Sequence, residues 1–317
     1  MFFTKHGALA PCFFQNLPIG GIVMELLLQY IVAGVTYGTI YAIVAIGFNI
    51  IYNTTGIINF AQGEFVMLGG MTAFTLKEYL PLPVAIMAAV IITMIIGALI
   101  EIVFIRWLHK PSVLRMIIIT IGLSILIRET ALHIWGEGVT ALPYFTGTSV
   151  TAVNLGGVFI SPQVFWAVGI SSIMVILLGI FFNFTLLGKQ MRACSANREA
   201  ARLCGISTQN MVTFSFMLSA AIGALGGCIV SPITYVQYDS GSQLAIKGFT
   251  VAILGGLGNS SAAVAAAMIL GILESFSIWA LPAAYKDVVS IAIMLLILFV
   301  KPSGLFGNAA AARLKEY

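Results

Sequence analysis

Long apolar stretches separated by short polar segments dominate the chain. A membrane-crossing helix needs about 20 mostly apolar residues, and charged or turn-forming residues mark its ends. This pattern predicts about eight spans, at 26–51, 57–76, 84–105, 116–135, 163–184, 211–231, 262–280 and 287–300. A further apolar stretch at 246–257 is too short to cross at about 1.5 Å per residue, so we expect a broken or re-entrant segment there. The predicted fold is an all-α, polytopic helical bundle embedded in a membrane.

The composition supports the membrane class. Of the 317 residues, 60% are hydrophobic and 8% are charged, and the mean hydropathy is +1.06. A soluble domain carries about 25% charged residues. The net charge of +4 is concentrated in loops rather than along a stripe, so no nucleic-acid partner is expected. The cysteines have neither CxxC spacing nor histidines at metal-ligand spacing, so we expect inert thiols, no metal and no cofactor. They are Cys12, Cys194, Cys204 and Cys228.

Basic residues set the expected orientation, because loops rich in Lys and Arg stay in the cytoplasm. The basic loop at 106–115, the loop at 186–210 and the C-terminal tail fall on one side, provided that 246–257 counts as a pass. These regions carry Arg106, His109, Lys110, Arg115, Lys189, Arg192, Arg198, Arg202, Lys301, Arg313 and Lys315. The N-terminus and the 136–162 loop are then outside. The lysines expected outside are Lys5, Lys77, Lys247 and Lys286.

Two stretches at opposite ends of the sequence share a weak internal echo. Residues 65–70 (FVMLGG) resemble residues 249–256 (FTVAILGG), with two residues inserted. They lie in segments expected to run in opposite directions, which is typical of transporters built from inverted repeats with interrupted helices. Glycine-rich membrane helices also produce such matches by chance, so an inverted repeat is one of two interpretations.

Polar residues after the first span are candidates for a transport pathway. Thr54, Thr55 and Gly56 interrupt regular helix, and non-helical backbone at membrane depth is tolerated only inside protein or along a wet cavity. An intramembrane glutamate is costly and by default faces the bundle or a water path. We therefore consider Asn59, Gln62 and Glu64 as pathway residues. The alternative is a structural Glu64, bonded to neighbouring backbone or to Asn59.

The other intramembrane charges favour structural pairing. Arg128 must be neutralised, and Glu129 or Glu274 is the expected partner; a proton relay would need more carboxylates in register. Glu101 is expected to reach the membrane interface near Arg106. The run Gly255–Gly258 lacks the GxxxxGK[ST] pattern of a phosphate loop, and no convergent catalytic set occurs. An enzyme is therefore not expected.

The loop from Gly188 to Ile206 carries the most specific pattern. A short amphipathic helix can begin at Ser195 or Asn197, with Gly205 as its stop. Acidic Glu199 would lie in the first turn and basic Arg202 in the last, as the helix dipole favours. One interpretation is a helix on the membrane surface. The paired alanines at 200 and 201 favour another, because small side chains permit insertion into a groove of a second protein.

Here a family resemblance becomes plain. Glu199-Ala-Ala followed by Gly205-Ile206 resembles the ATPase-coupling loop of ABC importer permeases. The fuller pattern is similar to the shorter permease type of the branched-chain amino-acid transporter family. The residues that the resemblance assigns to the coupling loop are Gly188, Arg192, Arg198, Glu199, Ala200, Ala201, Arg202, Leu203, Gly205 and Ile206.

Three further stretches, at 49–65, 247–259 and 301–307, resemble other signatures of that family. The family usually has His where Gln62 stands and Gly where Asn53 stands, which leaves the solute less certain than the class. The resemblance covers 24–307 as a transmembrane permease domain. It leaves 308–317 as a cytoplasmic tail and 1–23 as an extension, either a degenerate signal peptide or sequence that precedes a start at Met24.

The resemblance implies a permease subunit without its own ATPase site, in a bacterial-type inner membrane. The implied partners are a second permease subunit, two cytoplasmic ATPases, an extracytoplasmic solute-binding protein and the lipid bilayer. The implied solutes are leucine, isoleucine and valine, with another amino acid, an amide or urea as the alternative. An ion-coupled secondary transporter would also explain Glu64 and the broken segment, but it gives no reason for the alanine-rich loop helix.

Overall fold

The computed structural model describes residues 19–107, 113–148, 151–155, 158–282, 285–301 and 304–306. Within them the chain is mainly helical, with one short hairpin. The helices are α1 (Ile19–Thr55), α2 (Gln62–Lys77), α3 (Leu82–Ile100), α4 (Val113–Trp135), α5 (Pro162–Phe184), α6 (Leu186–Ala196), α7 (Arg198–Leu203), α8 (Thr208–Thr234), α9 (Ser240–Gly255), α10 (Ser260–Ala280) and α11 (Lys286–Val300). A π-helical turn, η1 (Glu101–Ile105), extends α3, and β1 (Val153–Leu155) pairs antiparallel with β2 (Val158–Ile160).

Six of the described helices are long and apolar enough to cross a membrane, which confirms the predicted fold class. They are α1, α3 with η1, α4, α5, α8 and α10. The segments predicted at 57–76 and 287–300 form α2 and α11, which have only 16 and 15 residues. The chain leaves helix at Gly56, whose φ of 71° is left-handed, and α2 begins only at Gln62. The count of about eight spans therefore separates into six long helices and shorter ones.

The segment predicted as broken at 246–257 lies mostly on α9, a continuous helix of 16 residues. Its first turn crosses the first turn of α2 at two glycines. A Cβ on Gly63 would collide with the carbonyl oxygen of Gly241, so the crossing requires glycine. Both short helices thus begin beside each other inside the bundle. The two halves of the internal echo, 65–70 and 249–256, lie mainly on these helices, and the inverted repeat stays a prediction.

The core of the bundle surrounds α1 and α8. In each of these two helices 72% of the most apolar stretch is buried, against 22% in α4 and in α5. The last five turns of α1 are almost fully enclosed, because α1 packs against α8, α9 and α10. The peripheral helices instead expose aliphatic side chains such as Leu126 and Leu177. Apolar side chains on the outside of a helical bundle are expected where lipid is the solvent.

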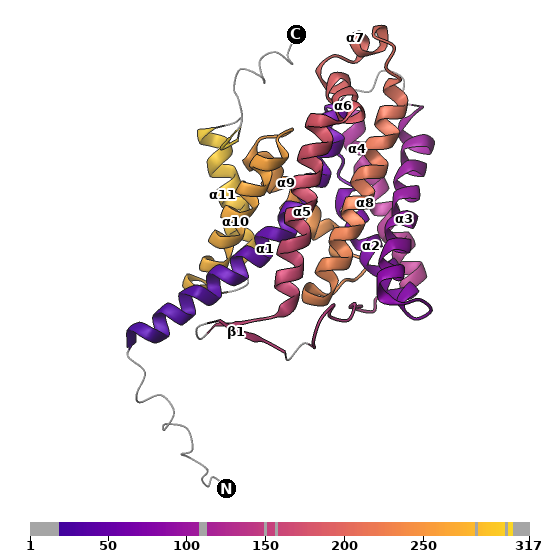
Figure 1. Ribbon diagram of the computed structural model, residues 1–317. Helices are drawn as coiled ribbons and strands as arrows, with labels where there is room; N and C mark the ends of the chain where they lie inside the picture. The colour runs from indigo at the N-terminus through magenta and orange to yellow at the C-terminus, as the bar shows by residue number, and fades with distance from the viewer. Residues whose placement is uncertain are drawn as a thin grey trace, which may run out of the picture.

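Figure 1 places α6 and α7 at one end of the bundle, which we call the α7 end, and the start of α1 and the β hairpin at the other. Arg106 lines one cavity with Arg198, and Lys301 follows the upper end of α11, so the predicted grouping of described basic loops is confirmed. Lys247, which was predicted outside, lies within α9. The residues His109, Lys110, Arg313, Lys315, Lys5 and Cys12 lie outside the described residues.

Candidate functional site

The ends of α7 are fixed by its own sequence. Asn197 is the N-cap, and its Oδ1 accepts a hydrogen bond of 2.9 Å from the amide of Ala200. At the other end Gly205 has a φ of 81°, and the amide of Ile206 donates to the carbonyl of Ala201 over 3.0 Å. This hydrogen bond is the 6→1 bond of the Schellman motif, which ends a helix at a left-handed glycine. The predicted Asn197 cap and Gly205 stop are both confirmed.

Of the two alanines of α7, one is buried and the other is exposed. Ala201 is 4% exposed and packs against a cluster from α1, α5, α6 and α8, whereas Ala200 is exposed. Leu203, in the last turn, is 90% exposed. An alanine pair on a helix spans only about 100°, so an interior alanine leaves its neighbour on the flank. The alanine pair suggested insertion into a groove of a second protein; in the structure only Ala200 of the pair is exposed, together with the more prominent Leu203.

Helix α6 ties α7 to the membrane helices. Thr185 caps α6 by accepting from the amide of Gly188 over 3.0 Å, and Met191 is completely buried in the same cluster as Ala201. Cys194 is also buried there, and burial raises the pKa of its thiol. On the exposed face of α6, Arg192 donates a hydrogen bond of 3.2 Å to Asn183. Displacement of α7 would therefore be transmitted directly to α1, α5 and α8.

An open cavity of ≈ 310 Å³ lies beside α7, lined by Arg198, Glu199 and Glu101 among others. Glu101, which was predicted at the membrane interface near Arg106, is only 2% exposed within the subunit. The hydroxyl of Thr213 donates to Glu101 Oε2 over 2.6 Å, and Arg106 lies 3.4 Å from the same oxygen. The side chain is enclosed because η1 packs against α8.

The pathway candidates lie at the start of α2. Gln62 is completely buried: the Ser219 hydroxyl lies 2.5 Å from Gln62 Oε1, and Gln62 Nε2 donates to the Ser219 carbonyl over 3.3 Å. Asn59 is 2% exposed, and its Oδ1 accepts from the amide of Ala61 over 3.1 Å. The bonds of Gln62 connect the α1–α2 break to α8.

Glu64 is buried between α2 and α4. The hydroxyl of Ser124 donates to its Oε1 over 2.8 Å, and Oε2 has no hydrogen-bond partner among the described residues. Oε2 lies against Gly241, in the first turn of α9, where the positive end of a helix dipole favours a carboxylate. The expected bond to Asn59 is absent from the described contacts, and Ser124 takes that place.

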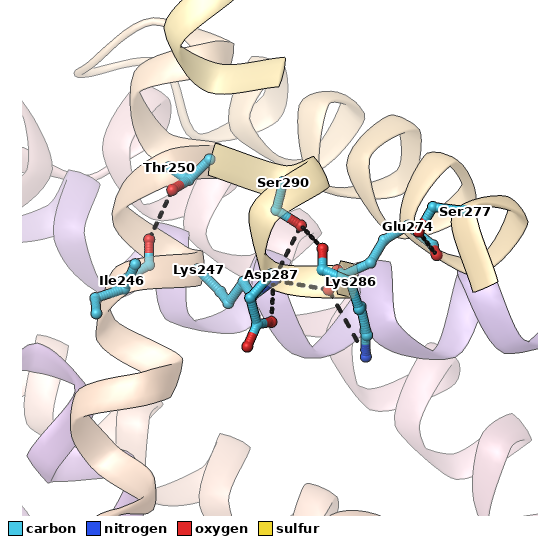
Figure 2. Close-up of polar contacts among 8 residues, drawn as sticks. All are labelled: Ile246, Lys247, Thr250, Glu274, Ser277, Lys286, Asp287 and Ser290. Carbon is cyan, nitrogen blue, oxygen red and sulfur yellow. Dashed lines mark hydrogen bonds and ion pairs between the residues drawn. The ribbon is translucent and has the colours of Figure 1, made fainter. Parts of the chain in front are cut away.

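Of the two partners expected for Arg128, the structure pairs it with Glu129 and not with Glu274. Arg128 lies 3.6 Å from Glu129, as one alternative predicted, and both side chains are partly exposed. Glu274 is not its partner. Glu274 is fully buried and pairs with Lys247, whose Nζ is 2.7 Å from Glu274 Oε1 (Figure 2). Glu274 was expected only as a partner of Arg128, so its pair with Lys247 was not predicted.

Lys247 is the centre of a larger polar cluster. Besides Glu274, its ammonium contacts Asp287 Oδ1 at 2.8 Å and Ser290 Oγ at 2.9 Å (Figure 2). Lys286 lies 3.7 Å from Glu274 and 3.5 Å from the centre of the Tyr37 ring. Two lysines and two carboxylates from α9, α10 and α11 thus meet in a nearly apolar bundle. We define Lys247, Glu274, Lys286 and Asp287 as the charge cluster.

Comparison with known proteins decides the family. The model of the family described as branched-chain amino acid transport system / permease component matches residues 30–298. The chain belongs to this family. It is 32% identical over 296 residues to the high-affinity branched-chain amino acid transport system permease protein LivH of Salmonella typhimurium, covering 89% of this chain and 96% of that protein. It is 31% identical to BraD of Pseudomonas aeruginosa, with the same two coverages.

A solved structure, PsaBC from Streptococcus pneumoniae in complex with Fab, aligns with 92% of this chain and 95% of its own, at a TM-score of 0.45 and 13% identity. The family assignment agrees with the resemblance carried by the sequence motifs and with the multi-pass helical bundle. The chain is therefore a permease component of the branched-chain amino acid transport family, embedded in the inner membrane by several helices.

The family stretches identified in the sequence converge at the α7 end. Asn49 of α1 accepts a hydrogen bond of 2.9 Å from the amide of Gly258, in the loop after α9. The amide of Leu305 donates to the carbonyl of Leu254 over 2.7 Å. These contacts bring three family stretches, separated in sequence by up to about 250 residues, to the end of the bundle that carries α7.

Proposed function

We propose that this chain is the membrane-embedded permease subunit of an ABC importer for leucine, isoleucine and valine. The proteins it resembles at 31–32% identity are named as branched-chain amino acid transport permeases. The observation that carries the mechanism is α7, a short capped helix that exposes Ala200 and Leu203 while Ala201 anchors it. Its exposed face suits a groove on a separate subunit.

ATP hydrolysis in that separate subunit would move α7. Because Ala201, Met191 and the cluster around them belong to one packed core, α7 and α6 move with α1, α5 and α8 rather than alone. Packed helices respond to such a displacement by rigid-body rocking between two arrangements. In this mechanism the chain supplies the pathway and the docking helix, and the motor subunits supply the free energy.

The proposed assembly contains a second permease subunit, two cytoplasmic ATPases and an extracytoplasmic solute-binding protein. The α7 end then faces the cytoplasm together with the C-terminus, and the start of α1 faces outside. The basic residues of that end support this orientation, since Arg106, Arg192, Arg198, Arg202 and Lys301 gather there. The exposed aliphatic faces of α4 and α5 suit the lipid bilayer.

The decisive experiment perturbs docking without perturbing the fold. Leu203→Ser removes a side chain that is 90% exposed in the subunit, and burial of a leucine is worth about 2 kcal/mol, so ATPase affinity should fall by about 30-fold. Ala200→Trp should block docking by bulk. The matched control is Leu186→Ser, at an equally apolar residue that is 72% exposed on α6. Co-purification of the ATPases with the tagged chain measures docking.

Normal ATPase stoichiometry with Ala200→Trp would contradict the docking role. A different result would overturn the importer assignment as a whole: uphill leucine uptake by the purified chain alone, in vesicles without any ATPase, would assign it to ion-coupled transport. Uptake by the complete assembly should instead require ATP, and competition by unlabelled leucine, isoleucine, valine, other amino acids and urea identifies the solute.

The pathway role of Asn59, Gln62 and Glu64 belongs to the same proposal, supported by their burial at the α1–α2 break. Glu64→Gln retains an oxygen that can accept from Ser124, so assembly should be normal while uptake falls. If the variant assembles and transports like the wild type, Glu64 is structural only. The variant Ser124→Ala serves as a control for the loss of the hydrogen bond itself.

A further inference from the structure

An open cavity lies beside the charge cluster, near the middle of α1. Its volume is ≈ 350 Å³, within the range of small-molecule sites, which begins at about 300 Å³. Its inner wall includes Ile40 and Tyr41, which are 1% and 4% exposed, and its rim includes Ile246, which is 56% exposed. The cavity therefore leads from the surface of the subunit to buried side chains of α1.

The cavity combines charges of both signs with an aliphatic wall. Lys247, Lys286 and Asp287 line it, together with Leu244, Ile246 and Ile291. Glu274 lies behind Lys247 and completes two positive and two negative side chains. A neutral cluster next to apolar surface matches a ligand that is itself neutral overall, carries both charges close together and has an aliphatic side chain.

The ammonium groups of Lys247 and Lys286 differ in how many of their hydrogen-bond donors already have a partner. The ammonium of Lys247 already has three oxygen partners within 2.9 Å, which accounts for its three donors. Lys286 has, among the described contacts, only the longer 3.7 Å pair with Glu274 and the Tyr37 ring. Its donors remain available to a carboxylate. Asp287 has one oxygen on Lys247, and its side chain is 75% exposed, so its other oxygen is available to an ammonium group.

The energetic cost of the cluster argues against a purely structural role. Ionisable side chains at membrane depth are expensive, and those retained there usually mark a substrate or ion path. Glu274 is fully buried, and its Oε2 has no hydrogen-bond partner in the described part of the chain. An apolar quartet would pack the same helices at lower cost. In transporters with short or interrupted helices the ends of these helices contribute to substrate sites, and the first turns of α9 and α11 line this cavity.

We propose that the cavity between α1, α9 and α11 is a transient subsite for a zwitterionic aliphatic amino acid, with Lys286 binding its carboxylate and Asp287 its ammonium group. The proposal rests on the proposed importer function and adds a location for the solute within this subunit. Lys247 and Glu274 act as positioning residues, because their pair holds α9 against α10 and orients Asp287.

The test uses the purified full chain in nanodiscs, with Cys12 and Cys204 replaced by serine and Ile246→Cys as a reporter at the rim. We expect saturating L-leucine to slow maleimide labelling of the reporter by about fivefold, because such sites enclose most of a ligand's surface. Isoamylamine, which lacks the carboxylate, and isocaproate, which lacks the ammonium, should protect far less. A reporter at Tyr79→Cys, 79% exposed after α2, should label at the same rate with or without leucine.

Two variants then assign the charges. Lys286→Gln and Asp287→Asn should each abolish leucine protection of the reporter, whereas Lys77→Gln, at an exposed lysine on α2, should keep it. Asp287 is largely exposed, so its variant remains informative if loss of Lys286 impairs folding. In the complete transporter both variants should slow leucine uptake by about tenfold while ATPase co-purification stays normal, since they lie far from α7.

Three results would overturn the subsite. Leucine could leave the labelling rate unchanged while the complete transporter imports leucine, which removes the subsite and leaves the importer function standing. Isoamylamine could protect as well as leucine, which removes the carboxylate contact. Phosphatidylglycerol in the nanodisc could slow labelling where leucine does not, which would assign the cavity to a lipid headgroup. Failure of the complete transporter to import any branched-chain amino acid would instead refute the importer function itself.

Discussion

Removal of the Lys247 ammonium tests how the structure accommodates a buried carboxylate. Lys247→Met keeps an unbranched side chain of similar length but deletes the group that lies 2.7 Å from Glu274. Glu274 is fully buried, and its only other described cation is Lys286, at 3.7 Å. Because loss of one partner leaves the other charge uncompensated, the variant should be destabilised.

The expected magnitude follows from that geometry. Loss of one partner of a buried pair costs about 3–5 kcal/mol, and a central charge in a membrane helix costs about 3 kcal/mol. Lys286 retains part of the attraction, so the lower end applies, about 3 kcal/mol. By the usual dependence of melting temperature on stability, this corresponds to a decrease of about 6–12 °C. The double variant Lys247→Met/Glu274→Met removes both charges and should recover most of that loss.

Loss of the monodisperse chromatographic peak after heating measures this stability in detergent. Lys77→Met is the matched control, because Lys77 is exposed at the end of α2 and should change the midpoint little. The reasoning is refuted if Lys247→Met melts with the wild type. It is also refuted if the double variant is no more stable than the single one, because the cost would then come from packing and not from an unpaired charge.

The remaining predictions concern the α7 end and the α2–α9 crossing. At pH 7 a maleimide should modify exposed Cys204 at least about tenfold faster than Cys194, because burial shields the Cys194 thiol and raises its pKa. Bound ATPase should protect Cys204 from the maleimide. Equal labelling rates for the two thiols would contradict the packing of α6. Gly63→Ala should lower the yield of folded protein, since the added Cβ meets the Gly241 carbonyl, whereas Gly122→Ala, with open space around it, should not. Normal yield with Gly63→Ala would refute the close crossing.

The position of the alanine pair explains how the bundle could be driven from one end. Ala201 belongs to the core cluster that also contains Met191 and side chains of α1, α5 and α8. Ala200 and Leu203 are on the outside of the same helix of six residues. Because a helix this short moves as a rigid unit, a displacement of its exposed side also displaces the core side chains that pack against Ala201. This is the physical basis for transmitting a motor's movement.

The sequence alone determined the features that depend on local chemistry. Runs of apolar residues predicted the long helices, because hydrocarbon selects side chains irrespective of their neighbours. Asn197 and Gly205 predicted both ends of α7, because caps and left-handed stops involve residues within one or two turns. The family was likewise recognisable from stretches of the sequence, and the family comparison confirmed the family.

Tertiary structure alone decided which residues from distant segments meet. Glu274 could be placed by depth but not by direction, so its pairing with Lys247 and not Arg128 emerged only from the crossing of α9 and α10. The contact of Gln62, at the start of α2, with Ser219 of α8 likewise joins residues that no local pattern relates. An ion pair or a helix crossing joins residues far apart in the chain, and its geometry depends on how whole helices pack. No local pattern encodes that packing, whereas composition and capping are encoded residue by residue.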